Sequence, residues 1–326
     1  MFPYQISIVV PAYKEAESLP ELCLWIEQVM QSNQFSYEII IVDDGSTDNT
    51  WQVIQAISQK NPLVKGLQFN RNYGKSAALH TGFQKASGEV VVTIDADLQD
   101  DPEEIPELYR MITEDNYDLV SGWKQKRQDP LSKTIPTKLY NAVTRWFSGI
   151  PLHDFNCGLK AYKNSVVKSI EVYGEMHRYI PVIAKAAGFK NIGEKKVKHH
   201  PRKYGTTKFG LERFLFGFLD LLSISFVTRF RKRPMHFFGG LGVLSFLVGF
   251  LIASFLIAEK IISIYQKTSY RNVTEQPLFY LALIAMIIGV QLFTAGFIGE
   301  MIITNSSKTQ EYIISQTFGF GEHKNM

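Results

Sequence analysis

Short apolar runs alternate with segments of helical periodicity over roughly the first 120 residues of the chain. The apolar runs lie at Ile6–Val10, Tyr37–Val42, Val64–Phe69, Glu89–Ile94 and Asp118–Ser121. Helical patterns lie at about 18–31, 76–86 and 102–113, and Thr47 or Asp48 can cap a further helix after the turn at 43–46. Continuous Val- and Ile-rich strands separated by helices are typical of a parallel sheet that is covered on both faces. The pattern therefore predicts an α/β domain with a mostly parallel sheet.

Two much longer apolar runs occupy the C-terminal third, at about 235–258 and 278–300. Each suffices for a helix that crosses a bilayer, which takes about 20 apolar residues. Buried core helices are the alternative, but no other large core is predicted here for them to join. The first run follows four basic residues, Arg229, Arg231, Lys232 and Arg233, and the positive-inside rule places this flank in the cytosol. Two crossings return the chain there, so we expect a multi-pass inner (plasma) membrane protein with both termini cytosolic.

These patterns divide the chain into a cytosolic domain (1–207), an amphipathic juxtamembrane segment (208–233), two transmembrane helices (within 234–303) and a cytosolic tail (304–326). Apolar and basic residues mix in 208–233, which suits helices that lie along a bilayer surface. A basic stripe is also typical of nucleic-acid binding. Its position directly before a membrane span favours anionic lipid headgroups, and no nucleic-acid partner is expected.

Composition narrows the class of protein further. The 326 residues carry a net charge of +4, with 45% hydrophobic and 20% charged residues, which excludes a disordered or collagenous chain. The two cysteines, Cys23 and Cys157, are too few and too far apart for a disulfide framework or a cysteine zinc site. They suit a reducing compartment, as expected of a cytosolic domain.

Polar clusters follow the predicted strands at 11–15, 43–46 and 95–99, where parallel sheets bind their ligands. Two common nucleotide-binding motifs do not occur there. No strand is followed by G-x-G-x-x-G, and Gly74-Lys75-Ser76 cannot end a P-loop because Phe69 stands where the loop needs glycine. Lys75 is nevertheless expected to approach a bound donor.

Asp95 and Asp97 flank Ala96 directly after an apolar strand. Residues two apart in extended backbone point the same way, so the two carboxylates converge and repel unless a cation or proton lies between them. Oxygen ligands favour Mg²⁺ or Mn²⁺, which commonly bridge such carboxylates to phosphates, and Gln99 can add another oxygen. A solvated acidic turn is the structural alternative to this metal site.

Four stretches of the chain resemble family 2 glycosyltransferases: VVPAYKEAESLP from residue 9, YEIIIVDDGSTDNT from 37, DADLQDDPEEIP from 95 and DFNCGLKAY from 154. The later RKYGTTKF, from residue 202, is similar to the polyprenyl-phosphate branch, which includes dolichol-phosphate mannose synthase. The two C-terminal spans resemble those of bacterial GtrB-like polyisoprenyl-phosphate glycosyltransferases. The resemblance covers nearly the whole chain and implies a GT-A (Rossmann-like) catalytic domain, a nucleotide-sugar donor and Mg²⁺ or Mn²⁺.

The resemblance also implies roles for individual residues. Nucleoside contacts fall on Pro11, Tyr13, Glu15, Val42 and Asp44, and the metal–diphosphate site on Asp95, Ala96, Asp97 and Gln99. Lys124 and Lys138 stand where the relatives have arginine, and lysine cannot make the same bidentate phosphate contacts. Arg202 and Lys208 match the basic pair of the last motif, and Asp154 matches the acid of D-x-x-[SC]-G.

A polyprenyl phosphate acceptor would bring a nucleophilic oxygen that is already anionic, so no strong general base is needed. The metal on Asp95 and Asp97 would stabilise the leaving diphosphate. Arg202, Lys208 and Lys138 would hold the lipid phosphate. In-line attack predicts inversion at the anomeric carbon, with Asp97 and Asp154 as the catalytic pair. We interpret Asp154 as an orienting group, and a role as a base stays open.

The resemblance favours glucose transfer from UDP-glucose to undecaprenyl phosphate. GDP-mannose or another sugar donor is the alternative within this class. A processive polysaccharide synthase is a second alternative, although the chain has no Q-x-x-R-W motif and only two predicted spans. A membrane-anchored nucleotide-binding scaffold without catalysis is the third. Glycines in both spans allow a homo-oligomer, or simply packing of the two spans of one chain.

Overall fold

The computed structural model describes residues 2–125, 131–204, 234–268, 271–305 and 314–318. These residues belong to two compact units. The first holds the described residues up to 204 together with 314–318, and the second holds residues 234–305 without 269 and 270.

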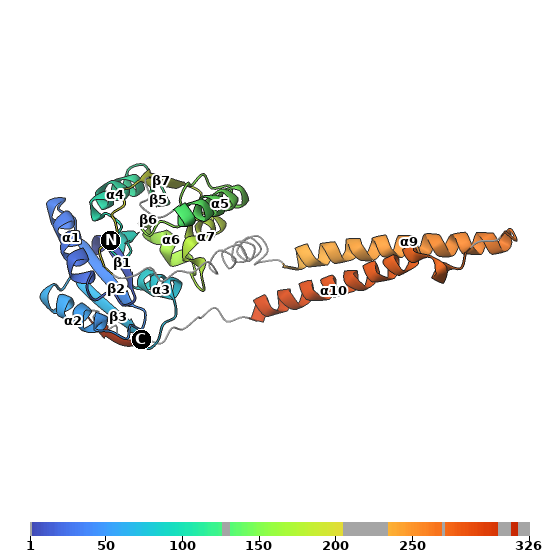
Figure 1. The fold of residues 1–326 in the computed structure, drawn as a ribbon, viewed down its shortest axis with the longest axis horizontal. Coiled ribbons are helices and arrows are strands. Elements are labelled where there is room, and N and C mark those ends of the chain that lie inside the picture. Colours follow the sequence, from blue (N-terminus) through green and yellow to red (C-terminus); the bar gives the residue numbers. More distant parts are fainter. Residues whose placement is uncertain (1, 126–130, 205–233, 269–270, 306–313, 319–326) are drawn as a thin grey trace. The chain divides into compact units, whose positions relative to one another are not determined.

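An eight-stranded sheet with the order β7-β5-β6-β4-β1-β2-β3-β8 forms the centre of the first unit (Figure 1). Its strands are β1 (Tyr4–Ala12), β2 (Tyr37–Asp43), β3 (Val64–Phe69), β4 (Gly88–Thr93), β5 (Leu119–Trp123), β6 (Lys160–Lys163), β7 (Ile192–Lys196) and β8 (Ile314–Phe318). Only β6 and β8 pair antiparallel with their neighbours. The predicted mostly parallel sheet is thus confirmed, and its first five strands lie within two residues of the predicted runs.

Helices cover both faces of this sheet. They are α1 (Leu19–Ser32), α2 (Thr50–Lys60), α3 (Lys75–Lys85), α4 (Ile105–Thr113), α5 (Leu131–Ser148), α6 (Asn164–Ser169) and α7 (Ile180–Ala186), with 3₁₀ turns η1 (Pro102–Glu104) and η2 (Met176–Arg178). Residues of α1, α2 and α4 belong to one apolar core, whereas those of α3, α6 and α7 belong to another. The predicted helix at 102–113 begins as η1 and continues as α4.

Alternating side chains of β1 explain why the sheet needs both layers. Ile6, Ile8 and Val10 belong to the core under α1, whereas Val9 belongs to the core under α3. Each fully buried side chain of this kind contributes about 1.5–3 kcal/mol relative to an exposed one. Parallel pairing then aligns the strand ends, with Ala12 opposite Asp43. The polar loops that follow β1, β2 and β4 therefore emerge at the same edge of the sheet.

The tail supplies a strand that the sequence did not predict. β8 pairs antiparallel with β3, placing Leu67 opposite Thr317. The indole Nε1 of Trp51 donates a hydrogen bond of 2.5 Å to Oε1 of Gln316. An uncovered β3 would present unpaired backbone groups, so β8 protects this edge of the sheet.

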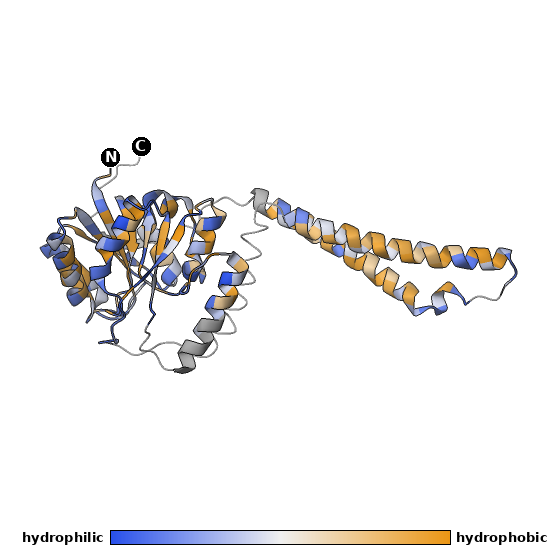
Figure 2. Ribbon diagram, turned by 90° about the horizontal axis from the view of Figure 1, so that it is seen from above, coloured by the Kyte–Doolittle hydropathy of each residue, from blue (hydrophilic) through white to orange (hydrophobic). Residues whose placement is uncertain are grey.

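Two long apolar helices form the second unit (Figure 2). A π-helical turn, η3 (Met235–Gly239), leads into α9 (Gly240–Tyr265), and the short η4 (Val273–Glu275) precedes α10 (Pro277–Asn305). Both helices have the length and composition to cross a membrane, and only 22% and 17% of their most apolar windows are buried. These low buried fractions disfavour the alternative that the two helices are buried core helices. α9 also runs past the predicted end at 258, through Glu259 and Lys260.

Glycines set how closely α9 and α10 approach. A Cβ atom on Gly242 would lie 2.6 Å from the carbonyl oxygen of Gly289, and one on Gly249 would lie 2.5 Å from that of Ala282. Ser245 Oγ donates across the same interface to the Ala285 carbonyl oxygen at 2.8 Å. Small residues permit such contact between apolar helices. These glycines therefore lie where the two helices of one chain pack together, which is one of the two roles expected from the sequence.

Candidate active site

The loops after β1 and β2 are joined at the carboxyl edge of the sheet. Asp44 N donates to the Ala12 carbonyl oxygen at 2.8 Å, and Glu15 N donates to Thr50 Oγ1 at 3.1 Å. Pro11 and Tyr13 lie half-buried in the same region. Val42 is opposite Pro11, but its side chain is fully buried in the core beneath α3, so any ligand contact of Val42 goes through its backbone. The predicted nucleoside contacts are thus grouped on two adjoining loops.

Asp44 connects these loops to the segment that leads into α3. Its carboxylate accepts hydrogen bonds from Tyr73 N at 2.7 Å and Gly74 N at 2.9 Å. The side chain is almost completely buried, and burial raises its pKa to about 6 despite these two bonds. Asp44 therefore positions Lys75, the first residue of α3. A direct contact with the nucleoside stays a prediction.

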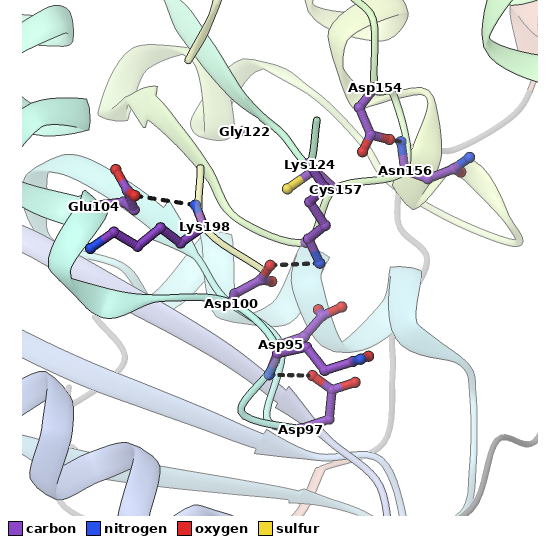
Figure 3. Close-up of polar contacts among 12 residues, drawn as sticks. Asp95, Asp97, Asp100, Glu104, Gly122, Lys124, Asp154, Asn156, Cys157 and Lys198 are labelled. Carbon is purple, nitrogen blue, oxygen red and sulfur yellow. Dashed lines mark hydrogen bonds and ion pairs between the residues drawn. The ribbon is translucent and has the colours of Figure 1, made fainter. Parts of the chain in front are cut away.

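Asp95 and Asp97 lie on the loop that follows β4 (Figure 3). Lys75 Nζ lies 2.5 Å from Asp95 Oδ1, and Arg202 Nη2 lies 2.5 Å from Asp97 Oδ2. Gly158 leaves room for this arrangement, since a Cβ atom there would lie 2.5 Å from Asp95 Cγ. The structure thus brings four predicted site residues together, from α3, the β4 loop and the segment after β7.

The electrostatics of the two carboxylates differ. Burial opposes ionisation of Asp95, but the positive charges of Lys75, Lys124 and Lys160 outweigh it and lower its pKa to about 2. Burial, and then the charge of Asp95, raise the pKa of Asp97 to about 6. Neighbouring carboxylates whose pKa values separate in this way gain from a bound cation.

The oxygen donors of this loop fit a divalent ion in kind. Asp95, Asp97 and Gln99 offer the carboxylate and amide oxygens that Mg²⁺ and Mn²⁺ prefer. Within the described part of the chain, no group of three or more His, Cys, Asp or Glu residues is placed to hold a metal alone. A metal here would therefore need further oxygens, such as those of a diphosphate.

Lys124 is held next to the same loop. Its Nζ lies 2.7 Å from Oδ1 of Asp100, which is fully buried, and Figure 3 shows this ion pair. The Asp100 charge outweighs the effect of burial and raises the pKa of Lys124. Sequence reasoning placed Lys124 near the diphosphate but missed Asp100, although Asp100 directly follows the aspartate motif.

Asp154 lies apart from Asp95 and Asp97 in Figure 3. It is 2% exposed, and its Oδ1 accepts a hydrogen bond from Asn156 N at 3.0 Å. Ser121 Oγ donates to its carbonyl oxygen at 3.2 Å. Of the predicted acceptor ligands, Lys138 belongs to α5 but its side chain lies outside the described part, and Lys208 lies outside the described residues. Arg202 is placed, and it meets Asp97.

Sequence reasoning missed two buried cations. Lys160, at the start of β6, and Arg178, in η2, are 3% and 8% exposed. Together with Asp95 they line a small cavity of about 20 Å³. The stretch DFNCGLKAY could have predicted this for Lys160, because it places a lysine at an inward position of an apolar strand.

A mostly parallel α/β sheet with an Asp-Ala-Asp loop at its carboxyl edge agrees with the GT-A type glycosyltransferase expected from the sequence motifs. The comparisons agree: residues 7–170 match the model of glycosyl transferase family 2. The chain belongs to this family.

Two curated relatives align over nearly the whole chain. Dodecaprenyl-phosphate galacturonate synthase of Rhizobium johnstonii is 33% identical over 96% of this chain and 93% of its own length. Undecaprenyl-phosphate 4-deoxy-4-formamido-L-arabinose transferase of Pseudomonas paraeruginosa is 34% identical over 93% of this chain and 87% of its own. The polyprenyl-phosphate resemblance is therefore confirmed.

Solved structures share the fold at low identity. Glucosyl-3-phosphoglycerate synthase from Mycobacterium tuberculosis, in complex with Mn²⁺, UDP-glucose and phosphoglyceric acid, has a TM-score of 0.53 and 18% identity over 69% of this chain and 80% of its own. Mannosyl-3-phosphoglycerate synthase from Rubrobacter xylanophilus has a TM-score of 0.57 and 14% identity over 70% and 75%. These likenesses confirm the GT-A fold.

Proposed function

We propose that the protein transfers a sugar from a nucleotide-sugar donor to the phosphate of a polyprenyl lipid. The observation that carries this proposal is the pair Asp95 and Asp97, each neutralised by a basic side chain at the edge where parallel sheets bind ligands. The names of the two curated relatives support a polyprenyl phosphate as the acceptor.

The chain's own residues supply charge and position. The acceptor oxygen is anionic near neutral pH, so the main barrier is the approach of two anions. Arg202 forms an ion pair with Asp97, and it is proposed to balance the acceptor phosphate together with Lys138 and Lys208. Lys75 and Lys124 lie on the Asp95 side and balance the donor diphosphate. A divalent ion, when bound, would neutralise charge on the leaving diphosphate.

Asp154 is proposed to orient the reacting groups, because its carboxylate is buried and already accepts the Asn156 amide. Attack in line with the departing diphosphate gives inversion at the anomeric carbon. If Asp154→Asn abolished turnover while donor and lipid-phosphate binding stayed intact, the orienting role would be wrong.

We propose that α9 and α10 cross the membrane and that the catalytic unit and both termini are cytosolic. The pairing of β8 with β3 supports this, because the chain before α9 and after α10 contributes to one sheet. Both native cysteines are buried, so introduced cysteines report accessibility cleanly. In intact cells, Thr274→Cys should react with an impermeant thiol reagent, whereas Glu17→Cys should react only after lysis. The reverse pattern would contradict the orientation.

A donor panel tests the function. The purified full-length protein is incubated with undecaprenyl phosphate, Mg²⁺ or Mn²⁺, and labelled UDP-glucose, UDP-galacturonate, UDP-galactose or GDP-mannose. UDP-glucose is the donor that the sequence favours, and galacturonate appears in the name of one relative. Labelled lipid from at least one donor is expected. Polymer growth would indicate a processive synthase, and nucleotide binding without any transfer would indicate a scaffold.

A further inference from the structure

The cavity beside Asp95 is lined by basic side chains. Lys75, Lys160, His177 and Arg178 line it, from α3, β6 and η2, whereas Asp97 and Arg202 do not. Its volume, about 20 Å³, suits a small group such as a carboxylate rather than a whole sugar. Asp95 therefore connects two places, the proposed diphosphate site and this cavity.

The ion pairs of the described residues leave one of these cations without an acidic partner. Lys75 pairs with Asp95, and Arg178 Nη2 lies 3.4 Å from Glu175 Oε2. The ammonium group of Lys160 donates a hydrogen bond to the Cys157 carbonyl oxygen. No carboxylate of the described residues forms an ion pair with it. Asp95 is the only carboxylate that lines the described cavity, and Lys75 neutralises it.

A buried ammonium group of this kind costs stability, because folding removes it from water without an ion-pair partner, and the charges of Asp154 and Asp95 offset only part of that cost. Burial, and then the charge of Lys75, lower the pKa of Lys160. An anionic group in the cavity would reverse this cost. A buried cation that lines a cavity and whose pKa is perturbed by burial and by neighbouring charges is a common feature of functional sites.

We propose that Lys160 binds a carboxylate on the donor sugar, so that the donor is a nucleotide-activated uronic acid. This inference rests on the proposed function, and it proposes a uronic acid in place of glucose as the transferred sugar. Position favours the sugar over the acceptor: the cavity includes Asp95, next to the proposed diphosphate, and excludes Arg202, the described ligand proposed for the acceptor. Arg178 and His177 would surround the same carboxylate.

UDP-galacturonate and UDP-galactose form a matched pair of donors, since they differ only in a carboxylate or hydroxymethyl group at C6. The wild-type protein is expected to use the uronate at least 10-fold better in kcat/KM. Lys160→Met should lower kcat/KM for the uronate by about 10- to 100-fold, the range for hydrogen bonds to charged groups. Because Lys160 also lowers the pKa of Asp95, galactose transfer serves as the reference, and the ratio of uronate to galactose kcat/KM should fall about 10- to 100-fold.

Two features keep this test clean. Among the described residues Lys160 has no ion-pair partner, so Lys160→Met, of similar size, breaks no buried ion pair and should fold. Lys163→Met makes the same change on the same strand at a residue that pairs with Asp118, outside the cavity. That control should change neither donor's kcat/KM.

Each other outcome overturns the inference in a distinguishable way. If the wild-type protein transfers neutral sugars as well as or better than the uronate, the donor is not a uronic acid, but the proposed function is still supported. A Lys160→Met effect confined to the KM for undecaprenyl phosphate assigns Lys160 to the acceptor. If no donor reacts at all, the proposed function fails, and calorimetry of the two UDP-sugars still tests Lys160. Equal affinities for UDP-galacturonate and UDP-galactose would contradict a carboxylate-binding role of Lys160.

Discussion

At the scale of single residues, each aspartate of the motif has its own cation. Lys75 neutralises Asp95, and Arg202 neutralises Asp97. Asp44 in turn holds the loop that presents Lys75. Substitutions at this edge should therefore alter ligand binding more than folding, except where a side chain is both buried and charged. Asp44 is such a case.

The stability of the protein should depend on pH through Asp44. Its pKa is raised from 3.8 to about 6 in the folded state, so the folded state binds the proton more tightly than the unfolded state. The resulting stabilisation is fully present below pH 3.8 and is lost as the pH rises to about 6. Two pKa units correspond to at most about 3 kcal/mol. Relative to Asp44→Asn, the wild-type Tm in detergent should fall between pH 4 and pH 6 and then level off. A constant difference would contradict this.

Gly158 should matter for activity rather than stability. The Cβ of Gly158→Ala would displace the Asp95 carboxylate, which is the movable end of a side chain. A displacement of about 1 Å in a reacting site can cost about 100-fold in rate. We expect the rate of sugar transfer to fall at least 10-fold. The Tm should change less than it does for a substitution in the apolar core. Unchanged transfer would show that Asp95 does not need its present position.

At the scale of elements, the turn after β2 depends on Gly45. Its φ is +66°, and an added Cβ would lie 2.3 Å from the backbone carbon of Arg71. Gly174 has a similar φ of +54° but open space around it. Gly174→Ala therefore measures the cost of the backbone angle alone, about 1 kcal/mol. Gly45→Ala should lower the Tm clearly more than Gly174→Ala, and equal effects would contradict the close contact.

The sequence predicted the elements whose patterns are local. Continuous apolar runs gave the first five strands, and the loops after them gave Asp44, Asp95 and Asp97. It missed β8, because Ile314–Phe318 becomes a strand only through pairing with β3, about 250 residues earlier. It also missed Lys160 and Asp100, whose importance comes from burial and partners that lie far away in the chain.

At the scale of the whole molecule, the tail links the region after α10 to the catalytic sheet. Deleting residues 311–326 would expose the edge of β3 and leave Trp51 Nε1 without its Gln316 partner. We expect a lower Tm and faster aggregation of the catalytic unit. Gln316→Ala, which keeps the strand, should have a smaller effect. A deleted form as stable as wild type would show that β8 contributes nothing to the sheet.

The central claim is that Asp95 and Asp97 hold a divalent ion against the donor diphosphate. Calorimetric titration with UDP, in Mn²⁺ and in EDTA, tests it most directly. The wild-type protein should bind UDP at least 10-fold more tightly with Mn²⁺. The double variant Asp95→Asn, Asp97→Asn should lose this dependence, even if freed Lys75 and Arg202 strengthen metal-free binding, and should not transfer sugar. An unchanged metal dependence, or transfer at the wild-type rate, would contradict the claim.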